Sequence, residues 1–307
     1  MDFKSYLELN AKKINLELDL ILQDFLNEVK KTNIKLVPFA LGLINSCKGG
    51  KRIRGVLVKL GYELTGNGLH LRGEAKMSSG PHLGGDILKI AAAFEILHTA
   101  FLIHDDIMDQ SPIRRGQPSL YKALGGGHYG ISQAITVGDI GLALPVKIIA
   151  QSNFLGEYKI KALEYFSQMI INTGWGQIMD VELVRGKGKG ESLDFARDKR
   201  GKGEMEFVQL YKTAKYTIAG PMQIGAILAG AEDEKLGVLG MFGENLGIAF
   251  QIQDDILDGE IKEVDQAKLK ALEYTSKAKK IISQITDELQ TRKLLEEMCQ
   301  YLVQRDK

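Results

Sequence analysis

The chain of 307 residues carries 40 Lys and Arg against 39 Asp and Glu, a formal net charge of +1 at pH 7. That balance gives no basis for expecting a nucleic acid or an anionic membrane surface as partner, while 44% hydrophobic residues suffice for a large buried core. The two cysteines, Cys47 and Cys299, are far apart in sequence and form no metal-type pair, so we expect a reduced, cytoplasmic protein.

Helical periodicity runs through almost the whole chain. Residues 3–31 alternate apolar and charged positions at helical intervals and lack the apolar core of a signal peptide. Residues 87–109 are apolar and Ala-rich before their acids begin, which indicates a central helix, buried on nearly every side, whose last turn reaches a polar cavity. Residues 242–258 repeat that design, and residues 267–307 predict two amphipathic surface helices.

The segment nearest to a membrane span is "ISQAITVGDIGLALPVKIIA" (131–150). Asp139, Pro145 and Lys147 interrupt it, so we interpret it as a buried core helix and expect no membrane span. Residues 65–85 are rich in Gly, Ser and Pro and predict a loop between helices, and residues 185–204 predict an exposed basic loop. Because alternating strand patterns are scarce, we predict one all-α domain over residues 1–307.

Two apolar helical runs end in clustered aspartates. The first cluster is Asp105, Asp106 and Asp109, and the second is Asp254, Asp255 and Asp258. Residues four apart share a helical face, so like charges accumulate there, at the negative end of a helix dipole and beside apolar residues. A cation would offset that cost, and carboxylates without His or Cys nearby select hard ions, so we predict Mg²⁺. A solvated acidic helix end is the alternative for either cluster alone.

Basic groups accompany the acids. "CKGGKRIRG" (47–55) sets two glycines before Lys51, Arg52 and Arg54. Such glycines let the backbone bend around an anion, and arginine binds phosphate bidentately. An ordinary basic loop is the alternative. Arg114 and Arg115 follow the first cluster closely enough to neutralise a phosphate held by its metals. His98 lies two turns before the first cluster on the same face, as either a core histidine or an anion contact.

The segment "YKTAKYT" (211–217) adds Lys212 and Thr213, which without other support would be surface helix residues. No residue stands out as a nucleophile, and no Ser-His-Asp or Cys-His grouping suggests itself. Chemistry that uses metals and phosphates without a protein nucleophile indicates ionisation of a diphosphate ester, with the resulting carbocation sheltered in an apolar helical cavity.

The sequence resembles the trans-isoprenyl diphosphate synthases, the polyprenyl synthetase family that includes farnesyl and geranylgeranyl diphosphate synthases. The matching segments stand in the family's order: "GGKRIR", "EILHTAFLIHDDIMDQSPIRRGQPS", "HYGISQAITVGD", "GWGQIMD", "KTAKYT" and "GIAFQIQDDILD". The resemblance implies an all-α bundle of antiparallel helices around a deep central cavity, in a homodimer. It also implies head-to-tail condensation of isopentenyl diphosphate with an allylic diphosphate and release of pyrophosphate.

The resemblance also assigns roles to individual residues. Mg²⁺ would be held by Asp105, Asp109 and Asp254, with Asp106, Asp255 and Asp258 close by. Arg114 and Lys212 would contact the allylic diphosphate, and Lys51, Arg54, His98 and Arg115 the isopentenyl diphosphate. Thr213 and Gln251 would place polar oxygens near the allylic carbocation, and the departing pyrophosphate would take the proton.

Product length in this family is set below the first acid cluster, where this chain has Ala100 and Phe101 about one turn before Asp105. Phe would shorten the cavity and Ala would leave room, so we expect C15 to C20 products. After "DDILD" the family continues with a glycine-rich segment carrying another lysine, and this chain lacks it. That gap supports one alternative, a weakly active or non-catalytic regulatory subunit of a prenyl synthase. The other alternative is a class I terpene cyclase, which also uses DDxxD and Mg²⁺. The "GGKRIR" segment argues against the cyclase, which needs no second diphosphate site.

Overall fold

The computed structural model describes residues 1–66, 83–185, 199–259, 261 and 263–303. The chain divides into two compact units, which are described separately below. The amino-terminal unit comprises residues 8–56 and 81–154, and the carboxy-terminal unit comprises residues 1–7, 57–80 and 155–307. Two helices, α1 (Phe3–Thr32) and α3 (Ile53–Thr65), contribute residues to both.

The amino-terminal unit is helical apart from one short hairpin. Besides its parts of α1 and α3, it contains η1 (Ile34–Leu36), α2 (Val37–Ser46), α4 (Leu83–Met108), β1 (Ile113–Arg114), β2 (Gln117–Pro118), α5 (Leu120–Ala123) and α6 (Gly127–Gln151). The two strands pair antiparallel, with Arg114 opposite Gln117. This hairpin follows the end of α4 directly and therefore brings the residues after the first acid cluster back toward it.

Helix α4 packs against α6 by placing side chains over glycines. A Cβ at Gly138 would lie 2.2 Å from Nε2 of His104, and a Cβ at Gly141 would lie 2.9 Å from the Ala100 Cβ. These contacts leave no room for larger residues on that face of α6. The expected burial of α4 is confirmed, because its residues from Ile90 to Leu97 are all buried.

By length and composition, two helices could cross a membrane: the stretch Asp86–Met108 of α4, whose most apolar window is 67% buried, and α6, whose window is 33% buried. Helix α4 is thus a core helix of this fold. Helix α6 is the helix expected over residues 131–150, but only one of its faces is buried, contrary to the expectation of a core helix. Its opposite side exposes Ile135 and Val146. Neither helix is shown to span a membrane.

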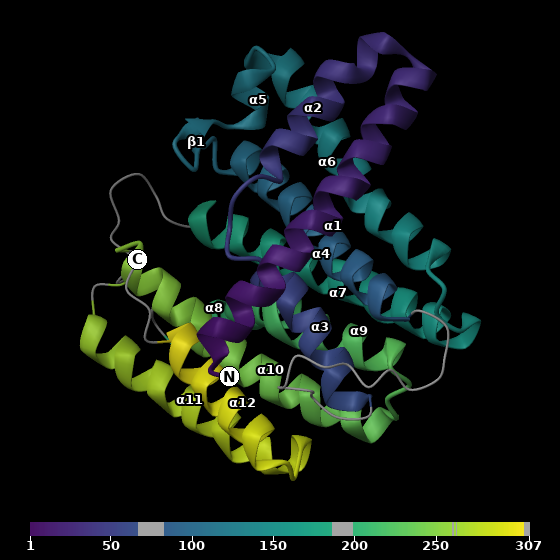
Figure 1. Ribbon diagram of the computed structural model, residues 1–307. Helices are drawn as coiled ribbons and strands as arrows, with labels where there is room; N and C mark the ends of the chain where they lie inside the picture. The colour runs from purple at the N-terminus through teal and green to yellow at the C-terminus, as the bar shows by residue number, and fades with distance from the viewer. Residues whose placement is uncertain (67–82, 186–198, 260, 262, 304–307) are drawn as a thin grey trace. The chain divides into compact units, whose positions relative to one another are not determined.

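The described residues of the carboxy-terminal unit are mostly helical. In chain order, after its parts of α1 and α3, its helices are α7 (Gly156–Arg185), α8 (Lys199–Val208), the π-helical segment η3 (Gln209–Ala219), α9 (Gly220–Leu228), α10 (Asp233–Leu257), α11 (Val264–Ile285) and α12 (Leu289–Val303). Helices α10, α11 and α12 lie side by side (Figure 1). The two amphipathic helices expected in residues 267–307 are confirmed as α11 and α12.

Glycines on two neighbouring helices hold η3 in place. A Cβ at Gly176 of α7 would lie 2.3 Å from the backbone nitrogen of Lys212, and a Cβ at Gly247 of α10 would lie 2.5 Å from the Cα of Ala214. Gly243 of α10 approaches the Ala219 Cα in the same way, at 2.4 Å. Backbone therefore packs directly on backbone, which brings the "KTAKYT" segment close to the helix that carries the second acid cluster.

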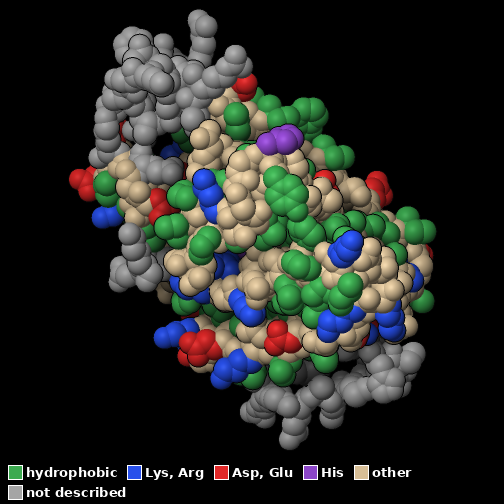
Figure 2. Space-filling view, turned by 90° about the horizontal axis from the view of Figure 1, so that it is seen from above, with side chains coloured by type: hydrophobic (Ala, Val, Ile, Leu, Met, Phe, Trp, Pro, Cys, Tyr) green, Lys and Arg blue, Asp and Glu red, His purple; other side chains and the backbone are tan. Residues whose placement is uncertain are grey.

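The all-α fold class is confirmed, since the described residues contain only the β1–β2 pair as sheet. Most of the two expected loops, residues 67–82 and 186–198, lies outside the described residues. The later loop was expected to continue to residue 204, whereas α8 already begins at Lys199. On the face seen in Figure 2, hydrophobic side chains reach the surface among both positive and negative ones, in keeping with the balanced charge.

Candidate functional site

The first acid cluster occupies the C-terminal end of α4. Asp105 and Asp106 lie in the last helical turn, and Asp109 follows it, with its backbone nitrogen donating to the Asp105 carbonyl oxygen at 2.8 Å. Asp106 is 3% exposed, and its Oδ1 accepts from Nε and Nη2 of Arg114 at 2.8 and 2.5 Å. The same Nη2 lies 3.7 Å from Oδ2 of Asp105. The hairpin thus returns Arg114 to the aspartates that precede it.

Burial governs the protonation of Asp106. Desolvation raises the pKa of its carboxyl above the ordinary value, and the hydrogen bonds and charge of Arg114 offset part of that rise. A buried carboxylate of this kind needs a permanent positive partner. Arg114 is therefore tied to the first acid cluster before any ligand arrives.

Four arginines lie near enough to His98 in the same unit to affect its pKa. Burial lowers the pKa of His98 well below its ordinary value, and the positive charges of its neighbours lower it further: Arg54, Arg115, Arg114 and Arg52. Burial also lowers the pKa of Arg115, and Arg52 and Arg114 add to the effect. Arg52 and Arg114 are paired with the carboxylates of Glu95 and Asp106. An anion bound beside His98 would offset the repulsion among the remaining positive charges.

The loop before α3 contacts one of these arginines, Arg115. Gly49 and Gly50 have φ of +76° and +90°, in the region that favours glycine, so the backbone bends sharply there. A Cβ at Gly50 would lie 3.3 Å from Nη2 of Arg115, whose Nη1 donates to the Lys48 carbonyl oxygen at 2.6 Å. Lys51 is exposed and Arg54 is half-buried. The loop and the hairpin therefore meet at Arg115.

The second acid cluster ends α10 in the carboxy-terminal unit. Asp254 and Asp255 lie in its last turn, and Asp258 follows as the C-cap, donating from its backbone nitrogen to the Asp254 carbonyl oxygen at 2.9 Å. Two amides hold the Asp255 carboxylate: Gln251 donates to Oδ1 at 2.5 Å, and Gln209 of η3 donates to Oδ2 at 3.3 Å. The two clusters thus have the same arrangement at two helix ends.

Lys212 of η3 pairs with Asp180 of α7, whose Oδ2 lies 2.7 Å from the lysine Nζ. Both side chains are partly exposed, at 27% and 33%, so the ammonium is oriented by Asp180 and still reaches solvent. Thr213, next in sequence, is half-buried. The lysine is therefore positioned before any ligand binds.

The structure distributes the predicted site residues between the units. The amino-terminal unit contains Lys51, Arg54, His98, Asp105, Asp106, Asp109, Arg114 and Arg115. The carboxy-terminal unit contains Lys212, Thr213, Gln251, Asp254, Asp255 and Asp258. Sequence reasoning missed Asp180 and Gln209 as polar partners. Asp180 could have been found, because it closes the "GWGQIMD" segment. Gln209 carries no comparable signal, because its partner Asp255 is 46 residues away.

The donor set of the two clusters fits Mg²⁺. Both consist only of carboxylate oxygens, which hard divalent ions prefer. Among the described residues, no three His, Cys, Asp or Glu side chains form a metal site by themselves. Mg²⁺ does not require such a group, since it keeps several waters and takes one or two carboxylates together with phosphate oxygens.

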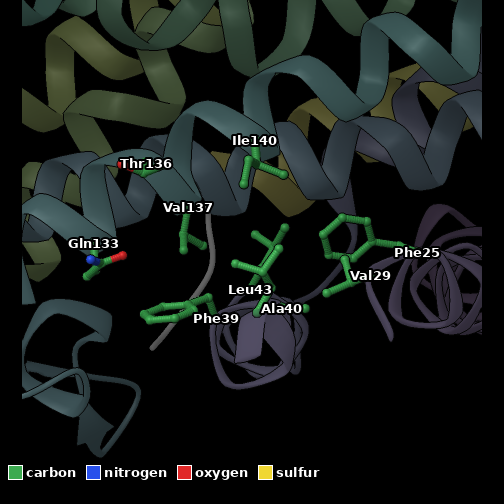
Figure 3. A pocket seen from close by; sticks show the side chains of 10 residues that line it. Phe25, Val29, Phe39, Ala40, Leu43, Gln133, Thr136, Val137 and Ile140 are labelled. Atoms are coloured by element: carbon green, nitrogen blue, oxygen red, sulfur yellow. The ribbon is translucent and has the colours of Figure 1, made fainter. Parts of the chain in front are cut away.

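An apolar cavity of the amino-terminal unit lies away from these residues. It measures about 160 Å³ and is lined by α1, α2 and α6 (Figure 3). Leu43, Val137 and Ile140 point into it from α2 and α6. A second cavity, of about 580 Å³, lies in the carboxy-terminal unit near Lys235. Neither is lined by a residue of the predicted site.

Comparison with known proteins supplies an independent view. Residues 42–302 match the family model described as polyprenyl synthetase. A geranylgeranyl diphosphate synthase of Sulfolobus acidocaldarius is 35% identical over 213 residues, which cover 68% of this chain and 54% of that protein. A farnesyl diphosphate synthase of Geobacillus stearothermophilus is 30% identical over 78% of this chain and 76% of that protein. The chain thus spans about half the length of the Sulfolobus relative.

Solved structures agree at the level of the fold. A geranylgeranyl pyrophosphate synthase from Corynebacterium glutamicum, solved in complex with isoprenyl diphosphate and magnesium, has a TM-score of 0.78 to this chain. The match covers 100% of both chains at 19% sequence identity. At that identity the likeness establishes the all-α architecture alone.

Proposed function

Because the chain belongs to the polyprenyl synthetase family, we propose that it is a trans-prenyltransferase that condenses isopentenyl diphosphate head to tail with an allylic diphosphate. One observation carries the proposal: Arg54 and Arg115 lie near His98 in the amino-terminal unit, and Arg114 contacts the cluster of aspartates that ends α4. Such a combination suits two diphosphates, one bound by cations directly and one bound through metal. The named relatives are diphosphate synthases, which supports the same class of reaction.

The aspartates of the two clusters would hold Mg²⁺, which when bound neutralises the allylic diphosphate as a leaving group. Arg114 and Lys212 would contact that diphosphate, and Asp106 and Asp180 already fix their orientation. An oriented donor requires less rearrangement when charge develops on the leaving group. The magnesium named in the Corynebacterium structure supports this choice of ion.

Lys51, Arg54, His98 and Arg115 would bind the diphosphate of isopentenyl diphosphate. With its pKa lowered, His98 stays neutral, so it can donate one hydrogen bond without adding charge. In the reaction the allylic C–O bond breaks, the double bond of isopentenyl diphosphate forms the new C–C bond, and the departing pyrophosphate accepts the proton that is lost. Thr213 and Gln251 would place their oxygens near the allylic carbocation.

We further propose C15 to C20 products, a homodimer and a cytoplasmic location. Relatives named farnesyl and geranylgeranyl diphosphate synthase support that product range. A row of exposed apolar side chains on α7, spaced by four and three residues, supports association with a second copy: Ile171, Trp175 and Ile178 are 49%, 56% and 54% exposed. Helix α7 is therefore the surface on which we expect the dimer to form.

The test uses purified protein with Mg²⁺, labelled isopentenyl diphosphate and, separately, C5, C10 and C15 allylic diphosphates. We expect a chelator-sensitive C15 or C20 product after dephosphorylation, absent in Asp105→Asn, which keeps the side-chain shape and removes the charge. Absence of elongation with every primer, in folded protein, would contradict the proposal and favour the regulatory subunit. Release of a cyclic hydrocarbon from an allylic diphosphate alone would favour the terpene cyclase.

A further inference from the structure

Arg52 differs from the other cations of the "GGKRIR" segment. Lys51 is exposed and Arg54 is half-buried, whereas Arg52 is only 6% exposed. Its backbone has a φ of +57°, which is uncommon for a residue other than glycine. An arginine held inside the protein in such a conformation must be stabilised by its own contacts.

The guanidinium of Arg52 contacts three protein groups. Its Nε donates to Oδ1 of Asn15 at 2.7 Å, and its Nη2 donates to the carbonyl oxygen of Cys47 at 2.8 Å. Its Nη1 lies 3.6 Å from Oε2 of Glu95 on α4. Each nitrogen of the guanidinium thus has a protein partner, and the planar fork has one orientation.

Glu95 ties the loop to α4 at a second point. It is 4% exposed, and its other oxygen, Oε1, accepts from the backbone nitrogen of Gly55 at 2.9 Å. A Cβ at Gly55 would lie 2.6 Å from the carbonyl oxygen of Ala91, so α3 begins in direct contact with α4. One buried carboxylate therefore connects positions on both sides of Arg54. Glu95 also lies three residues before His98 on the same helix, so the connection is adjacent to His98.

We propose that Arg52 and Glu95 are positioning residues: they fix the 47–55 loop against α4 so that Lys51 and Arg54 meet a diphosphate beside His98. The inference rests on the proposed function, and it excludes Arg52 as a phosphate ligand even though it lies between two predicted ligands. Fixing the loop in advance lowers the cost of ordering it on binding. The substrate affected is isopentenyl diphosphate, and the allylic diphosphate is bound by other residues.

The experiment measures binding of isopentenyl diphosphate alone by calorimetry, together with KM for both substrates. Variants are Glu95→Gln and Arg52→Met, and the matched control is Asp86→Asn. Asp86 is also a buried carboxylate of α4, 3% exposed, and accepts from the backbone nitrogen of Asn153 at 2.7 Å, away from the loop. We expect the first two to raise Kd for isopentenyl diphosphate about tenfold or more, as small misplacements of binding groups do. KM for the allylic substrate should stay within about twofold, and Asp86→Asn should lower Tm with Kd unchanged.

Two further variants separate positioning from direct contact. If the two residues act as one unit, the double variant Glu95→Gln with Arg52→Met binds no worse than either single variant. Arg52→Lys keeps the charge without the fork, and we expect it to resemble Arg52→Met. If the increases in Kd multiply in the double variant, or if Arg52→Lys binds with wild-type affinity, then Arg52 acts on the ligand by its charge. Either result would overturn the inference.

A milder variant covers the case in which Glu95→Gln or Arg52→Met fails to fold. Removing one partner of a buried ion pair is strongly destabilising, so Asn15→Leu serves as a milder variant, because Asn15 is exposed and supplies only one bond to Arg52. A smaller rise in Kd is expected there. If wild-type protein does not bind isopentenyl diphosphate at all, the proposed function fails. If wild type binds and Asn15→Leu, Glu95→Gln and Asp86→Asn all bind equally well, the positioning role alone fails.

Discussion

Two neighbouring residues, Ala100 and Phe101, lie one turn before Asp105 in different surroundings. Ala100 has no exposed surface, because it packs at Gly141, so it cannot leave room for a growing chain. Phe101 is half-buried. We therefore expect Phe101→Ala to give longer prenyl products than wild type, measured by chromatography after dephosphorylation. Ala100→Phe should instead lower Tm by overpacking the contact with α6. Unchanged product length in folded Phe101→Ala would contradict this assignment.

The half-buried imidazole of His98 makes stability depend on pH. Its pKa is lowered from an ordinary value of 6.5, so unfolding below that pH takes up a proton. The free energy of unfolding should therefore fall as pH falls below 6.5, by up to about 1.4 kcal/mol per pH unit from this group. His98→Gln keeps a neutral donor and does not titrate. Urea unfolding of both proteins between pH 7.5 and 5.5 should give diverging curves, and parallel curves would show that His98 titrates normally.

At the scale of the elements, two glycines of α7 make a matched pair. A Cβ at Gly176 would lie 2.3 Å from the Lys212 backbone, whereas a Cβ at Gly174 meets nothing within 4 Å. Gly176→Ala should thus cost about 1 to 3 kcal/mol by forcing η3 away, and should lower activity by moving Lys212. Gly174→Ala should stabilise the helix by about 0.5 to 1 kcal/mol. Urea unfolding measures both, and equal effects would mean that α7 and η3 do not depend on this approach.

The position of several helices, and of the acid clusters at their ends, could be predicted from the sequence. Periodicity and spacing located α4 and α10 and placed an acid cluster at the end of each, because these features depend on neighbouring residues. The π-helical form of η3 could not be predicted, since it is seated on glycines of α7 and α10. The roles of Asn15 and Glu95 could not be predicted either, because their hydrogen-bond partners lie 37 and 40 residues away in the sequence. Apolar composition also predicted a buried core helix over residues 131–150, yet only one face of α6 is covered.

At the scale of the whole molecule, the exposed apolar row on α7 is the proposed dimer interface, and a tryptophan within the row can report on dimerisation. Trp175 is the only tryptophan in the chain and is 56% exposed in a single copy. Burial against a second copy should shift its emission to shorter wavelength, so dilution of wild-type protein should shift the emission back. A two-fold interface uses the same patch on both copies, so each substitution counts twice.

Trp175→Glu should therefore convert the dimer into a monomer, because a buried carboxylate pair at a two-fold axis is unfavourable. Light scattering after size exclusion gives the mass directly, with 33.9 kDa expected for one chain. Leu289→Glu on α12 is the control, since that leucine is more exposed, at 78%, and lies outside the row. It should remain dimeric. A wild-type chain that is monomeric at all concentrations, or a dimer in Trp175→Glu, would remove α7 from the interface and leave its apolar row to be explained by another contact.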